Sequence, residues 1–96
     1  MHLVRAILVR KDPSACDEHD VARLIDALWA HCTDQDALEH VHGRSSRAGV
    51  DLVLFFRESP GTNPQRAAAE LIDRVYRGSA SARTLFEPCG EYQALA

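Results

Sequence analysis

Residues 38–57 read LEHVHGRSSRAGVDLVLFFR, and this stretch decides the fold. The run VDLVLFFR at 50–57 is rich in β-branched and aromatic residues, which are typical of strands. The run LEHVHGR at 38–44 alternates, with Val41 on one side and His40 and His42 on the other. Between the two runs, SSRAG at 45–49 is a short loop that ends in a glycine. The stretch therefore predicts a β-hairpin.

An amphipathic helix is predicted on each side of this hairpin. Over residues 17–32, apolar residues recur at helical spacing on one face: Val21, Leu24, Ile25, Leu28, Trp29 and Cys32. This pattern predicts that Leu28 and Trp29 both lie in the core. Ser14 with Asp17, or Asp17 with Asp20, can cap the start of this helix.

The second helix is predicted over residues 64–77. Asn63 followed by Pro64 suits a helix start, and Gly78 suits its end. The predicted buried positions share one helical face: Ala68, Leu71, Ile72 and Val75.

Extended runs are expected at both ends of the pattern, at 3–10 and at 84–89. The second run contains Pro88, which is tolerated on an edge strand but not inside a sheet. The order strand, helix, strand, strand, helix, strand is the split βαβ pattern. It predicts an α+β fold with an antiparallel sheet of strand order 4-1-3-2 and both helices on one face.

This pattern resembles the ferredoxin-like two-layer sandwich over residues 2–90. It lacks the cysteine pair that copper chaperones of this shape carry in the first loop, because only Cys16 lies there. It also lacks the exposed aromatic residues that RNA-recognition domains carry on both central strands, since the run at 3–10 has none. We expect a single domain over 1–96, with residues 91–96 as a tail outside the core.

The composition limits the partners and the cellular compartment. The 96 residues carry a formal net charge of −3, and the basic residues form no cluster of the kind that binds nucleic acid. No apolar stretch suits a signal peptide or a membrane span. Cys16, Cys32 and Cys89 lack the spacing of a zinc site or a disulfide framework. We expect a cytoplasmic protein with free thiols, no metal and no cofactor.

The sheet face that both helices leave uncovered is the predicted binding surface. If Val4, Ala6 and Leu8 point at the helices, alternation places their neighbours on the other face. That open face then carries a largely apolar set at its centre and rim: Ile7, Val9, Val53, Phe55 and Arg57. An exposed apolar patch of this kind favours a homodimer interface, a partner-protein site or a site for a hydrophobic small molecule.

Four polar residues on the same face could form a catalytic site: Arg5, His40, His42 and Asp51. A carboxylate can orient an imidazole that acts as a general base, and the hairpin could bring Asp51 near His42. The alternative function is therefore a cofactor-free enzyme of the dimeric α+β-barrel type, such as an isomerase, a cyclase or a monooxygenase. Because this set of residues is unspecific, we favour a non-catalytic binding or accessory module.

Overall fold

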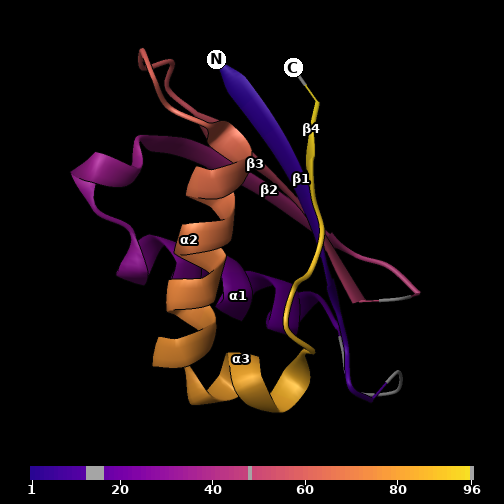
Figure 1. Cartoon of the computed structure of the whole chain (residues 1–96). Coiled ribbons are helices and arrows are strands. Elements are labelled where there is room, and N and C mark those ends of the chain that lie inside the picture. The colour runs from indigo at the N-terminus through magenta and orange to yellow at the C-terminus, as the bar shows by residue number, and fades with distance from the viewer. Residues whose placement is uncertain (13–16, 48, 96) are drawn as a thin grey trace.

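The computed structural model describes residues 1–12, 17–47 and 49–95. The elements follow one another along the chain as β1 (His2–Val9), α1 (Glu18–His31), the 3₁₀ turn η1 (Asp34–Asp36), β2 (Leu38–Ser45), β3 (Gly49–Phe56), α2 (Pro64–Gly78), α3 (Ala80–Leu85) and β4 (Tyr92–Ala94). Figure 1 shows α1 and α2 on the same side of the sheet, so the fold has two layers. The mixed α+β class is confirmed.

The four strands form one antiparallel sheet of order β2-β3-β1-β4. β1 and β3 pair along their whole length, from His2 opposite Phe56 to Val9 opposite Gly49. The hairpin of β2 and β3 is present as predicted, with a bulge between Leu38 and His40. The expected strand order agrees with this arrangement, and it leaves β2 and β4 at the two edges.

The core lies between the helices and one face of the sheet. Alternation along β1 and β3 predicted this face correctly, since Val4, Leu52 and Leu54 are fully buried. The predicted stripe of α2 is also confirmed, because all four of its residues are buried: Ala68, Leu71, Ile72 and Val75. The helices therefore cover the sheet through the residues whose spacing matches the period of each element.

Trp29 is not a core residue, and this prediction was wrong. Leu28 is completely buried, whereas 42% of Trp29 remains exposed. The buried face of α1 is narrower than the apolar stripe of its sequence and consists of Val21, Leu24 and Leu28 beside the capping Asp20. Ile25 and Cys32 are only half-buried, and Trp29 lies at the solvent border of the stripe.

Both helix starts were predicted correctly in the described part of the chain. The Asp17 carboxylate accepts from the Asp20 backbone N–H at 3.1 Å, and the Asp20 carboxylate accepts from the Asp17 N–H at 3.0 Å. This reciprocal capping box stabilises the first turn of α1. The Asn63 side chain caps α2 by accepting from Arg66 N–H at 3.2 Å. Ser14, the other candidate cap, lies outside the described residues.

The C-terminal part of the chain differs from the prediction. A short helix, α3, occupies residues 80–85, where the sequence suggested the start of a strand. Phe86 is buried and forms one bridge with Arg10, but the strand itself is β4, within the segment expected to be a tail. The cap explains α3, since the Ser79 side chain accepts from Ala82 N–H at 3.2 Å.

Gly49 begins β3 at a point where no other residue fits. Its φ is 158°, and a Cβ placed there would lie 1.9 Å from the Leu8 carbonyl oxygen. This close approach allows β3 to pair with β1 from its first residue. The glycine that ends the predicted loop is therefore required by the strand contact as well as by the turn.

None of the helices in the described ranges has the length and apolar character needed to cross a lipid bilayer.

Candidate functional site

The open face of the sheet carries exposed and half-buried apolar side chains on its two central strands. Ile7 and Val9 on β1 are 39% and 46% exposed, while Val53 and Phe55 on β3 are half-buried. Leu95, 46% exposed, follows β4 and donates its N–H to the Leu3 carbonyl at 2.8 Å. This group of residues has no helix over it, because α1 and α2 lie against the other face.

An ion pair crosses the middle of this face. Arg5 on β1 donates from Nε to Asp51 Oδ1 at 3.0 Å and from Nη2 to Oδ2 at 2.9 Å. Arg44 on β2 lies directly opposite Asp51, with its Nη2 at 3.7 Å from Oδ2. Asp51 therefore lies between two arginines. The hydrogen bond from Arg5 is the main reason that the pKa of Asp51 lies below its ordinary value.

The two histidines share the open face with Arg5 and Asp51, but they are not joined to them. His42 lies opposite Val53, and His40 lies opposite Phe55. The suggested approach of Asp51 to His42 is wrong, because the strand register brings Arg44 to that carboxylate. His40 contacts the Phe55 ring instead, at 5.2 Å between ring centroids and a tilt of 57°.

A cleft of about 640 Å³ adjoins the apolar part of the open face. Its floor is Ile7 and Val9, and its opposite wall is the chain segment 88–93 that leads into β4. Arg5 and Glu91 also line it, whereas neither histidine does. The chain leaves the edge of β1 here. Phe86 pairs with Arg10 and Tyr92 pairs with Ala6, so an advance of six residues along this segment lies opposite an advance of only four along β1. The extra residues bow outward and create the hollow.

Arg57 is separated from the other predicted binding residues. It follows β3 at the end of the sheet near His2, away from the cleft beside Val9. There it lines a second cleft, of about 460 Å³, together with the exposed Trp29 of α1. Asp34 and Ala37 also line this second cleft, and its inner wall includes Leu38 and Cys32.

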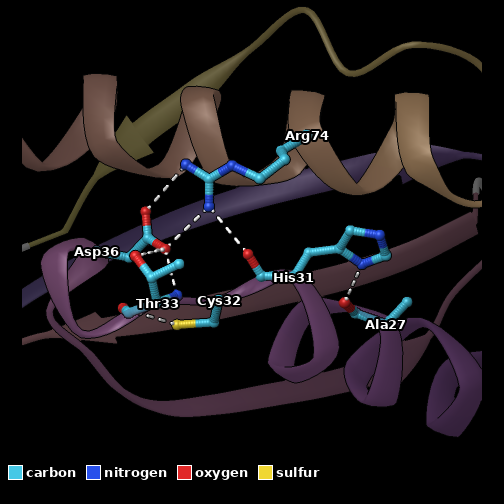
Figure 2. A network of polar contacts seen from close by, with 6 residues as sticks. All are labelled: Ala27, His31, Cys32, Thr33, Asp36 and Arg74. Carbon is cyan, nitrogen blue, oxygen red and sulfur yellow. Dashed lines mark hydrogen bonds and ion pairs between the residues drawn. The ribbon is translucent and has the colours of Figure 1, made fainter.

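A polar network lies beside this second cleft and includes two residues of its lining, Cys32 and Thr33. Figure 2 shows this network. Arg74 of α2 donates to the His31 carbonyl at 3.0 Å and to the two Asp36 oxygens at 2.9 and 3.3 Å. Asp36 also accepts from the Thr33 backbone N–H at 2.7 Å. Arg74 therefore caps the end of α1 and holds η1 against α2.

Two titratable groups in this network are shifted. Burial alone would raise the pKa of Asp36, but the hydrogen bonds from Arg74 and Thr33 outweigh it, and the pKa is lowered. Burial raises the pKa of the Cys32 thiol, so this side chain stays protonated at neutral pH. Asp36 is thus a firmly ionised anchor, and Cys32 contributes an uncharged surface.

The sequence did not reveal the second cleft. The apolar helical pattern of residues 17–32 predicted that Trp29 is buried, so it gave no sign that the indole is exposed. Asp34 lies in a polar connection that carries no functional signal in the sequence. The only signal was Arg57, a charged residue directly after the most apolar strand. Alternation assigned Arg57 to the open face because the end of the strand is not marked in the pattern.

Within the described ranges, no three side chains of His, Cys, Asp or Glu lie close enough to hold a metal ion. Cys32 and Cys89 are free thiols, and Cys16 lies outside the described residues.

Comparison of the chain with models of protein families, with curated proteins and with solved structures finds no match.

Proposed function

We propose that this chain is a small binding module of ferredoxin-like topology that associates with a second copy through its open sheet face. The observation that carries the proposal is the exposure of Ile7 and Val9 at 39% and 46% on a face that no helix covers. Antiparallel sheets that face water usually place polar residues there. Exposed apolar side chains at the end of a central strand favour burial against another surface.

The charges of the face support a second copy as the occupant. Arg5 and Arg44 are matched by Asp51 and by Glu91 at the rim of the cleft. Two such faces can therefore approach without a large like-charge penalty, and a two-fold axis is the commonest arrangement of protein copies. Because Arg5 and Asp51 already satisfy each other, neither needs a new partner when water leaves the face.

The size of the face limits the strength of the dimer. Three strands of eight residues and one of three, about 4.8 Å apart and with about 3.3 Å per residue, give a footprint of about 430 Å² per copy. Two copies would bury about 860 Å², below the roughly 1,000 Å² that a stable specific interface needs. We therefore expect a dimer that dissociates on dilution.

The enzyme alternative, with His40 or His42 as a general base, has less support. Asp51 is engaged by two arginines, and the cleft beside β1 is lined by neither histidine. If a substrate is found, alanine at either histidine should reduce turnover by at least about 100-fold for this alternative to hold.

Sedimentation velocity over a dilution series tests the proposal. The native chain should shift from dimer to monomer on dilution, and Val9→Asp or Phe55→Asp should give monomer throughout. Trp29→Asp is the matched control, because Trp29 is 42% exposed and Val9 is 46% exposed, but Trp29 lies on the helix side. A native chain that remains monomeric at the highest concentration overturns the proposal.

A further inference from the structure

The second cleft is lined by one negatively charged and one positively charged side chain that do not pair with each other. Asp34 and Arg57 both line it, yet within the described residues neither side chain has a hydrogen-bond or ion-pair partner. Their charged groups are thus too far apart for a direct ion pair, although they border the same hollow. By contrast, Asp36, two residues from Asp34, is fully engaged by Arg74.

Beside these charges the cleft has an aromatic and apolar surface. Trp29, which is 42% exposed, is the only tryptophan of the chain. Leu38, Ala37 and Cys32 continue the apolar surface, since the Cys32 thiol is uncharged at neutral pH. A large exposed indole next to half-buried apolar side chains offers a flat surface on which another ring can stack.

The walls of the cleft are held before anything binds. The Arg57 backbone N–H donates to the Ala37 carbonyl at 2.8 Å, which ties the end of β3 to the turn before β2. Ala37 itself has a left-handed backbone, with φ at 58°. On the other side, Arg74 holds η1 against α2 through Asp36 (Figure 2). A rigid wall lowers the entropy cost of binding.

We propose that this cleft binds a small aromatic zwitterion, an α-amino acid with an aromatic side chain. Its carboxylate pairs with the Arg57 guanidinium, its ammonium group pairs with Asp34, and its ring lies against Trp29. The volume of about 460 Å³ is within the range of small-molecule sites, about 300–1,000 Å³. A ligand with only one charge could pair with only one of Asp34 and Arg57, and the other would have no partner in the occupied cleft.

The fluorescence of Trp29 reports binding directly, because no other tryptophan is present. Titration with L-phenylalanine should give a saturable change in the millimolar range or below. Glycine lacks the ring, 3-phenylpropionate lacks the ammonium group and phenylalaninamide lacks the carboxylate. Each should bind at least about tenfold more weakly, since tenfold corresponds to about 1.4 kcal/mol.

Two variants assign the charges. Arg57→Gln should weaken phenylalanine binding at least about tenfold while leaving phenylalaninamide unaffected, and Asp34→Asn should remove the preference for phenylalanine over 3-phenylpropionate. Arg23→Gln is the control, because Arg23 is an exposed arginine on the same helix as Trp29. Melting curves establish that each variant is folded. The proposal is overturned if phenylalanine gives no saturable change, or if 3-phenylpropionate binds the native chain as tightly as phenylalanine.

Discussion

Arg5 and Asp51 are paired diagonally across the two central strands. Arg5 is directly opposite Val53, and Asp51 is directly opposite Ile7, yet the guanidinium reaches along the sheet to make two hydrogen bonds with the carboxylate. A slip of β1 against β3 would separate the two groups. The pair therefore reinforces, from the open face, the register that the buried residues set from the other side.

The first prediction concerns acid stability. The pKa of Asp51 is lowered from its ordinary value of 3.8, so the folded chain binds fewer protons there than the unfolded chain. The stabilisation is complete above the unfolded pKa and is lost as the pH falls through the lower folded pKa. The unfolding free energy of Asp51→Asn should therefore decrease less steeply than that of the native chain as the pH falls below about 4. Urea unfolding from neutral to acid pH measures this slope.

An acid slope that Asp51→Asn does not change would contradict the role assigned to the Arg5–Asp51 pair.

The second prediction compares two neighbours on α1. Leu28 is completely buried, so Leu28→Ala should lower the unfolding free energy by about 2–5 kcal/mol. Trp29→Ala should cost no more than about 1 kcal/mol, because the indole lies at the surface and leaves little cavity. Chemical denaturation of both variants gives the two values. A loss at Trp29 as large as that at Leu28 would mean that the indole packs in the core.

The third prediction concerns the joint between the helices. A double-mutant cycle with Arg74→Met and Asp36→Ala should give a coupling energy on the order of 1 kcal/mol. The reason is that Asp36 is nearly buried and Arg74 binds it at two oxygens. The exposed pair Arg77 and Asp73 on α2 is the matched control, for which about 0.3–0.5 kcal/mol is expected. Equal coupling in both cycles would show that the network of Figure 2 adds nothing to an ordinary surface pair.

The fourth prediction concerns glycine. Gly49→Ala should destabilise the chain by on the order of 3 kcal/mol, because the new Cβ would overlap the Leu8 carbonyl. Gly90→Ala is the control, since a Cβ there meets nothing within 4 Å. It should be neutral or slightly stabilising through the unfolded state. Thermal unfolding distinguishes the two, and similar melting temperatures would contradict the close contact of β1 and β3.

Much of the fold could be predicted because the sequence patterns match the geometry of the elements. The spacing of apolar residues in VDLVLFFR matches the two-residue period of a strand, and the spacing over residues 68–75 matches the period of a helix. Each spacing therefore identifies both the type of element and its buried face. The last strand was misplaced for a physical reason. Residues 84–89 have the apolar character of a strand, but the Ser79 cap starts a helix just before them, and the chain pairs with β1 only later.

The site was less predictable, because it depends on distances across the chain. Alternation correctly placed His42 and Asp51 on one face, but only the strand register shows that Arg44 is the partner of Asp51. The cleft at Trp29 involves the ends of four elements, α1, η1, β2 and β3, and such ends are the least certain part of a sequence pattern. The spacing of apolar residues on a helix also does not show which of them are fully buried and which lie at the border with solvent.

The offset between Phe86 and Tyr92 has a consequence for how the chain tolerates changes in length. Phe86 pairs with Arg10, and Tyr92 pairs with Ala6, on the same edge of β1. These two pairings differ in register by two residues, and the bowed segment between Phe86 and Tyr92 accommodates the two extra residues. One or two residues inserted beside Gly90 would lengthen the bow without moving either register, whereas the same insertion within β1 would shift all its contacts. The segment is therefore a natural position for a peptide epitope or a spectroscopic label.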